Sequence, residues 1–227
     1  MIGASVEPEG YLKLVEGHGW RITRVIDTHV HADHISQSRR LAELTGATLH
    51  LPAGAPVSYP HLPLGHGDEI EVGGVELRAI STPGHTPESA CYLLDEGALF
   101  TGDTLFLTAV GRPDLGATPE QAKEKARALH RSVVRLLDLT LETVVLPGHT
   151  PEPVAFDGKP LSAALGEVRG DVDLLREGEE AFVEKVSGRV SPPPTNHEQI
   201  VKLNRSGRLP EADPAELEAG GNRCAAG

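Results

Sequence analysis

Residues 28–34 read Thr-His-Val-His-Ala-Asp-His (THVHADH), so three histidines and one aspartate lie within seven positions. Such a cluster would gain little by packing in an apolar core, and its imidazoles would repel one another if they were protonated. Neutral imidazole and carboxylate are common ligands of divalent metal ions. The segment therefore predicts a metal site.

The chain around this motif alternates between helical and extended patterns. A helix that ends near Gly17 and an apolar strand over residues 22–26 come before it. A helix over residues 36–46 and a strand over 48–52 follow, so the motif is expected at the end of a strand. Strands and helices in alternation favour a layered α/β domain.

Two further segments have clear structural signals. Gly73-Gly74 separates two alternating runs, as in a two-residue β-hairpin. Residues 118–139 predict a long helix, with Thr118 and Gln121 as a capping box and Pro119 in the first turn. Its apolar face comprises Ala122, Ala126, Leu129, Val133 and Leu136.

Three polar residues elsewhere also follow predicted strands: His85 in STPGHT, Asp103 in TGD and His149 in LPGHT. Taken singly, either histidine could be a surface residue and Asp103 a turn former. Strand ends at one edge of a sheet lie close together, so these residues can converge with the motif. The predicted metal ligands are His29, His31, Asp33, His34, His85, Asp103 and His149.

The donor types leave two kinds of chemistry open. Two metals about 3–4 Å apart, bridged by a carboxylate such as Asp103, could activate a water molecule for hydrolysis. A single metal with two histidines, one carboxylate and open positions suits Fe(II) oxygen chemistry.

The composition indicates a cellular compartment and the classes of partner to expect. The formal charge of −12 disfavours nucleic acid, and no long apolar run or signal peptide is present, so we expect a cytoplasmic protein that does not bind membranes. The only cysteines, Cys91 and Cys224, form no CxxC pair, which argues against a thiolate zinc site. We expect Cys91 in the core and Cys224 at the surface.

The segments THVHADH, STPGHT, TGD and LPGHT, in this order, resemble those of the metallo-β-lactamase superfamily. The resemblance covers roughly residues 20–155. It implies a four-layer αββα sandwich with a metal site at one edge of the paired sheets. By position, the first metal would take His29, His31 and His85. The second would take Asp33, His34 and His149, with Asp103 between the two.

The words THVHADH, GHTPES and GDTLFLTAVGRPDL look most like the persulfide dioxygenase branch. That likeness implies mononuclear Fe(II) held by His29, His85 and Asp103, and oxidation of a thiol persulfide such as glutathione persulfide by O₂ to sulfite, a step of sulfur metabolism. Arg112 and Thr86 fall where the branch contacts its thiol substrate. Equally, Arg112 could form a structural salt bridge with Asp114 or another carboxylate.

Glyoxalase II is the alternative that the resemblance leaves open. It uses the same seven positions for two metals, here two Zn(II) or mixed Zn/Fe, and hydrolyses a glutathione thioester. Under either reading Asp33 and Asp103 are the expected catalytic carboxylates, and the substrate is a small thiol conjugate. The full-length form of glyoxalase II carries a helical C-terminal domain, for which the tail of this chain is short.

The resemblance also predicts the domain boundaries. Residues 1–186 are expected to form the metallo-β-lactamase-type domain, and residues 187–227 a Pro-rich spacer, a short helix and a partly disordered tail. The family usually has about two further strands before its motif, so we expect either that the sequence starts late or that the first sheet is trimmed. We expect no fused rhodanese domain, so a rhodanese partner would be a separate chain. A homodimer is one option.

Overall fold

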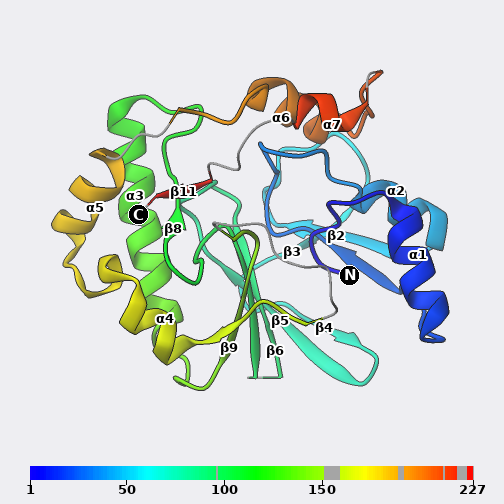
Figure 1. The fold of residues 1–227 in the computed structure, drawn as a ribbon, viewed down its shortest axis with the longest axis horizontal. Helices are drawn as coiled ribbons and strands as arrows, with labels where there is room; N and C mark the ends of the chain where they lie inside the picture. Colours follow the sequence, from blue (N-terminus) through cyan, green and yellow to red (C-terminus); the bar gives the residue numbers. More distant parts are fainter. Residues whose placement is uncertain (96, 151–158, 189–191, 212, 219–223, 227) are drawn as a thin grey trace. The chain divides into compact units, whose positions relative to one another are not determined.

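The computed structural model describes residues 1–95, 97–150, 159–188, 192–211, 213–218 and 224–226 (Figure 1). The chain divides into two compact units. The first contains Met1–Leu64 and Pro194–Gly221, and the second contains Gly65–Pro193 and Asn222–Gly227. In the described parts of the chain, no helix is both long and apolar enough to cross a membrane.

The first unit contains a three-stranded parallel sheet in the order β1-β2-β3. It also contains four helices among its described residues. Its elements are α1 (Pro8–Gly17), β1 (Arg24–Ile26), α2 (Ser38–Thr45), β2 (Thr48–Pro52), β3 (Leu62–Leu64), α6 (His197–Ser206) and α7 (Pro214–Leu217).

The segment around the motif folds as its pattern predicts. The motif follows β1, whose residues Val25 and Ile26 are buried, and it precedes α2. Helix α2 ends at Gly46, which has the left-handed backbone (φ 68°) that glycine adopts without a steric penalty. The motif therefore lies in a loop between a buried strand and a helix.

The second unit contains a six-stranded sheet in the order β10-β9-β7-β6-β5-β4. Strands β7 and β9 are parallel, and the other neighbouring pairs are antiparallel. The strands are β4 (Glu69–Val72), β5 (Val75–Ser81), β6 (Ala90–Leu94), β7 (Ala98–Gly102), β9 (Val144–Pro147) and β10 (Ala163–Ala164). The hairpin at Gly73-Gly74 is confirmed, because Val72 pairs with Val75 and both glycines have positive φ.

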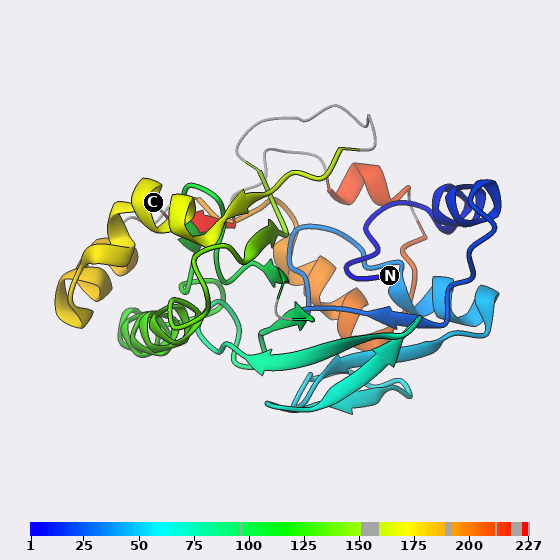
Figure 2. The ribbon, with the colours of Figure 1, turned by 90° about the horizontal axis from the view of Figure 1, so that it is seen from below.

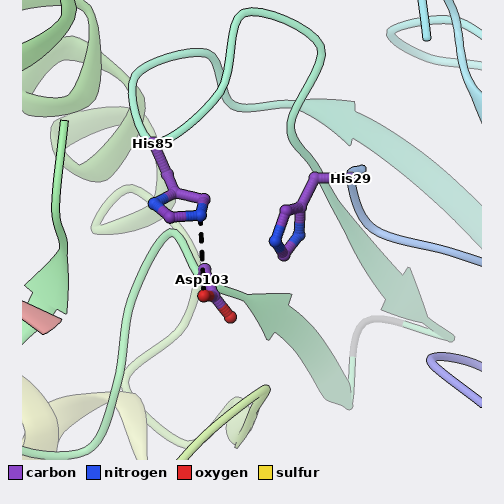
Figure 3. A group of neighbouring side chains, drawn as sticks. All are labelled: His29, His85 and Asp103. Atoms are coloured by element: carbon purple, nitrogen blue, oxygen red, sulfur yellow. Dashed lines mark ion pairs between the residues drawn. The ribbon is translucent and has the colours of Figure 1, made fainter. Parts of the chain in front are cut away.

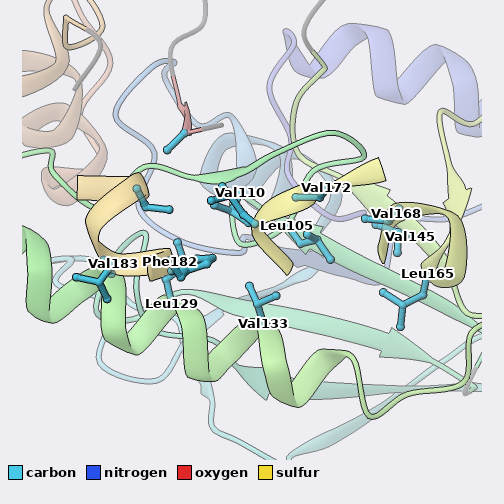
Figure 4. Close-up of a cluster of buried hydrophobic side chains, with 14 residues drawn as sticks. Leu105, Val110, Leu129, Val133, Val145, Leu165, Val168, Val172, Phe182 and Val183 are labelled. Carbon is cyan, nitrogen blue, oxygen red and sulfur yellow. The ribbon is translucent and has the colours of Figure 1, made fainter. Parts of the chain in front are cut away.

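The helices of the second unit gather on one side of this sheet (Figures 1 and 2). They are α3 (Pro119–Leu136), α4 (Leu165–Asp171), a 3₁₀ turn (Asp173–Arg176) and α5 (Glu179–Gly188). All five apolar residues predicted for the face of α3 are buried, and three of them share a cluster with residues of α4 and α5 (Figure 4). The predicted α3 capping box is present in both directions.

The last described residues form a short strand, β11 (Ala225–Ala226), that pairs with β8 (Val110–Gly111). The backbone N–H of Arg112 also donates to the carbonyl of Cys224 at 2.8 Å. As a result Cys224 is only 2% exposed, so the prediction of a surface cysteine was wrong. Cys91 is buried in β6 as predicted, and burial raises the pKa of its thiol to about 11.

The mixed α/β class is confirmed. The predicted domain boundary near residue 187 stays a prediction, and by contacts Pro194–Gly221 belongs to the first compact unit and Asn222–Gly227 to the second. The predicted short helix is present as α6. Part of the predicted spacer and tail, residues 189–191, 212, 219–223 and 227, lies outside the described residues.

Thr118→Ala is expected to destabilise the protein by about 1 kcal/mol, because the hydroxyl caps the backbone N–H of Gln121 at the start of α3. Urea unfolding measures this loss. Thr118→Ser keeps the hydroxyl and is expected to retain most of the stability. Equal losses in the two variants would contradict the capping role.

Candidate metal centre

The first unit brings together three of the predicted ligands in the loop between β1 and α2. His31, Asp33 and His34 each offer a ligand atom, and these atoms lie within 4.8 Å of one another. Nδ1 of His34 is 3.2 Å from Oδ2 of Asp33, and the rings of His31 and His34 have centroids 4.1 Å apart. Imidazole and carboxylate groups are suitable donors for divalent metals.

His29 lies in the same loop and is buried. Its ring centroid is 4.2 Å from that of His31, and the hydroxyl of Thr28 contacts its Nδ1 at 2.9 Å. A hydrogen bond at one ring nitrogen orients an imidazole and favours coordination through the other nitrogen. Thr28, the first residue of the motif, therefore helps to orient a predicted ligand.

Asp27, directly before the motif, anchors the loop to the start of α2. Its carboxylate accepts hydrogen bonds from the hydroxyls of Ser36 (2.7 Å) and Ser38 (2.5 Å). Burial raises the pKa of Asp27, while these hydroxyls and the nearby His34 act in the opposite direction. Asp27 is not among the predicted site residues, although an acidic residue at the end of a buried strand is an unusual feature.

In the second unit, Asp103 is the central residue. It follows β7 and is buried, with Oδ2 3.6 Å from Nε2 of His85 and Oδ1 3.3 Å from Nε2 of His149. Figure 3 shows the ion pair between His85 and Asp103. Each carboxylate oxygen thus faces a different histidine, as a bridging ligand between two metals would.

A backbone carbonyl determines that Nδ1 of the His85 ring carries a hydrogen. Nδ1 of His85 lies 2.8 Å from the carbonyl oxygen of Arg112. Because a carbonyl only accepts, Nδ1 must carry the hydrogen in this contact, and Nε2 is then the nitrogen directed at Asp103. This is a common arrangement for a histidine that binds a metal through Nε2.

Glycines allow the backbone to approach closely around Asp103. A Cβ on Gly111 would lie 1.8 Å from the carbonyl oxygen of Asp103, and one on Gly148 would lie 2.7 Å from Oδ1 of that residue. Gly84 has φ 148°, and a Cβ there would lie 2.4 Å from Cα of Leu129 in α3. The two Pro-Gly-His turns therefore need glycine before the histidine.

The structure places Arg112 in the structural salt bridge that was one of its two interpretations. Its guanidinium is 2% exposed and donates from Nε (2.8 Å) and Nη2 (2.6 Å) to the two carboxylate oxygens of Asp114. Nη1 donates to the carbonyl of Pro192 at 3.1 Å. A role of Arg112 in binding substrate stays a prediction.

Thr86 lies in the turn after His85. Its hydroxyl is 2.7 Å from the hydroxyl of Ser89, whose oxygen also accepts from the backbone N–H of Thr86. These contacts stabilise the turn that carries His85. The role of Thr86 as a substrate contact also stays a prediction.

Cys224 lies near His149 and is not among the predicted site residues. Its Sγ and a ring nitrogen of His149 lie within 4.8 Å of each other. No local pattern in NRCAAG predicts this contact, because it depends on β11 pairing with a strand more than a hundred residues earlier in the chain.

Comparison with known proteins identifies the family. The model of the metallo-beta-lactamase superfamily matches residues 2–149. The chain belongs to this superfamily. All seven predicted ligands lie within the matched residues, so membership supports binding of metal by the chain.

Similar proteins of the metallo-beta-lactamase superfamily include a hydroxyacylglutathione hydrolase from Chelativorans sp. (strain BNC1). The two are 32% identical over 75% of this chain and 66% of the relative. The chain therefore spans about two thirds of the length of the curated relatives that it matches first.

Two solved structures support the metallo-beta-lactamase fold. A metallo-beta-lactamase from Staphylococcus aureus subsp. aureus COL has a TM-score of 0.82 at 28% identity, covering 94% of this chain and 66% of that chain. ETHE1 from Myxococcus xanthus has a TM-score of 0.64 at 30% identity, covering 96% of this chain and 83% of that chain.

Gly84→Ala is expected to destabilise the protein by about 2 kcal/mol more than Gly116→Ala. Both glycines have positive φ, but a Cβ on Gly84 would collide with Leu129, whereas one on Gly116 would have nothing within 4 Å. Denaturant unfolding of the two variants measures the combined cost of the collision and of the backbone at φ 148°, relative to a glycine at φ 62°. Losses of equal size would show that the close approach to α3 is unimportant.

Asp114→Asn is expected to destabilise the protein by about 3 kcal/mol at pH 7, because it leaves a buried guanidinium without its carboxylate. Burial alone would raise the pKa of Asp114, but the Arg112 guanidinium holds it below the ordinary value of 3.8. A carboxylate with a lowered pKa stabilises the fold fully above the unfolded value and loses this effect as the pH falls through the folded value.

The difference in unfolding free energy between wild type and Asp114→Asn should therefore be constant from pH 7 to about 5 and shrink below about pH 4. Denaturant titrations across this range measure it. Asp138→Asn, at an exposed carboxylate, serves as the control. A difference that does not change with pH would contradict the ion-pair argument.

Proposed function

We propose that this protein is a dinuclear metallo-hydrolase that cleaves a thioester of a low-molecular-weight thiol, in the manner that the name hydroxyacylglutathione hydrolase describes. The observation that carries the proposal is the carboxylate of Asp103, whose two oxygens face two different histidines. A ligand for one metal needs only one of these contacts. A bridging ligand needs both.

The ligand assignment follows the order of the family's motifs. His29, His31 and His85 would hold one ion, Asp33, His34 and His149 the other, and Asp103 would bridge them. Contacts inside each unit support it. Asp33 and His34 contact each other, and His85 and His149 lie on opposite oxygens of Asp103.

Two divalent ions, if bound by these residues, would lower the pKa of a water molecule and polarise the carbonyl of a thioester. The residues of this chain would keep the site ready for that reaction. The carbonyl of Arg112 holds His85 in one tautomer, and the hydroxyl of Thr28 orients His29. In the overall reaction a C–O bond forms, the C–S bond breaks, and the thiol leaves with a proton from water, so no oxidant is required.

A second candidate is the oxidation of a thiol persulfide by O₂. The similarity to ETHE1 from Myxococcus xanthus favours it, as does the donor set of His29, His85 and Asp103, which suits a single Fe(II). In this case the remaining predicted ligands would surround the iron site without binding a metal: His31, Asp33, His34 and His149. The two candidates share a small thiol-conjugate substrate and differ in metal count and in their need for O₂.

One set of assays separates the candidates. Protein loaded with zinc or iron is tested for cleavage of S-lactoylglutathione without O₂, and iron-loaded protein for O₂ uptake with glutathione persulfide. Elemental analysis gives the metal content. The hydrolase proposal expects two metals per chain and thioester cleavage without O₂. One iron per chain with O₂ uptake, and no thioester cleavage, would replace it by the second candidate.

Asp33→Ala and Asp103→Ala distinguish the two metal positions. Under the hydrolase proposal, Asp33→Ala removes a direct ligand, so the metal content should fall from about two to one and the rate by about a hundredfold or more. Asp103→Ala removes the bridging carboxylate and should weaken the binding of both metals. Metal analysis and thioester cleavage rates measure these effects, with the exposed Asp138→Ala as control. Full thioesterase activity in Asp33→Ala would contradict the proposal.

A further inference from the structure

Asn204 lies on α6, far in sequence from the metal-binding loop, yet its side chain contacts that loop directly. It is 7% exposed. Its Nδ2 donates to the backbone carbonyls of His31 (2.9 Å) and His34 (2.8 Å), and its Oδ1 accepts from the backbone N–H of Ser36 (3.0 Å). One carboxamide therefore holds three backbone groups of the loop.

The chemistry of the partners defines the orientation of this amide. Both carbonyls can only accept and the N–H of Ser36 can only donate, so a flipped carboxamide would lose all three hydrogen bonds. Both amide hydrogens of Asn204 are used. A buried amide without partners would be costly, and this one is satisfied by the loop.

Helix α6 itself is firmly placed in the first unit. Ile200 on this helix is fully buried, and the carbonyl of Gly207 at its end accepts from Nη1 of Arg39 at 2.9 Å. A Cβ on Gly207 would lie 2.6 Å from the ring of Tyr59, and the guanidinium of Arg39 lies over that ring at 5.4 Å. The helix can therefore act as a rigid support.

A second residue from the same part of the chain reaches the loop. The carboxylate of Glu218 accepts from the backbone N–H of Ile35 at 2.7 Å. Together with Asn204, it holds the stretch in which the motif turns into α2. That stretch carries Asp33 and His34 without regular helix or strand, so hydrogen bonds from elsewhere determine its shape.

We propose that Asn204 is a positioning residue for the metal site. It fixes the backbone at His31 and His34 so that their rings and the carboxylate of Asp33 converge before a metal arrives. The inference rests on the proposed function only in that the loop binds a metal, and not on the reaction performed. Groups that orient metal ligands without touching the metal typically contribute 10–100-fold to metal affinity.

The test compares Asn204→Ala with two variants on the same helix. Gln199→Ala removes an exposed carboxamide, and Ile200→Val perturbs the buried face of α6 without touching the three hydrogen bonds. The probe is Co(II), added to metal-free full-length protein and followed by its visible absorption and by calorimetry, well below the unfolding temperature of each variant.

Asn204→Ala is expected to bind Co(II) about tenfold or more weakly, while Gln199→Ala and Ile200→Val stay within about twofold of wild type. If Asn204 served only to hold α6, then Ile200→Val and Asn204→Ala would both lower thermal stability and both leave the affinity unchanged. Asn204→Ala with the Co(II) affinity of wild type would overturn the proposal.

A conservative variant covers the case in which Asn204→Ala does not fold. Asn204→Ser keeps one short hydroxyl donor, cannot replace all three hydrogen bonds, and is expected to bind Co(II) more weakly than wild type. Wild-type affinity in this variant, with wild-type absorption, would also count against the proposal. Because these readouts need no substrate, the absence of thioesterase activity would reject the proposed reaction and leave the positioning role standing.

Discussion

The structure of the candidate site depends on one constraint, which is that polar side chains must be held in fixed positions where they are hidden from water. Asp103 shows it most clearly, because its carboxylate is buried and faces an imidazole on each side. A buried charge is tolerated only if nearby groups compensate it. Glycine at positions 111 and 148 lets the backbone come close enough for this arrangement, since a side chain at either place would collide with Asp103.

The loop of the first unit meets the same constraint with hydrogen bonds instead of regular secondary structure. Asp27 holds it near the start of α2, and Asn204 and Glu218 hold its backbone from the C-terminal segment. Ordering the loop lowers its conformational entropy. Because these contacts order the loop when the protein folds, this loss of entropy does not oppose metal binding. A preordered set of ligands then binds a metal more tightly than a mobile one.

Local patterns predicted much of the fold, and the set of metal ligands stays a prediction. The hairpin at Gly73-Gly74, the capped helix α3 and the strand before THVHADH depend on residues near one another in sequence, so their patterns are visible in it. The contacts of Asn204 and the burial of Cys224 were missed because they depend on pairings over more than a hundred residues. An asparagine on the buried side of a short helix has no sequence pattern that reveals its partner.

The predicted ligands and the residues that hold the ligand loop lie in different parts of the sequence. The family match ends at residue 149 and contains every predicted ligand, whereas Asn204 and Glu218, which hold the loop, lie beyond it. The same ligands suit either hydrolysis with two metals or oxygen chemistry with one iron, so ligand identity alone does not select the reaction. Asn204 and Glu218 hold the backbone of the loop that carries Asp33 and His34, so contacts that shape this loop lie outside the residues that the family model matches.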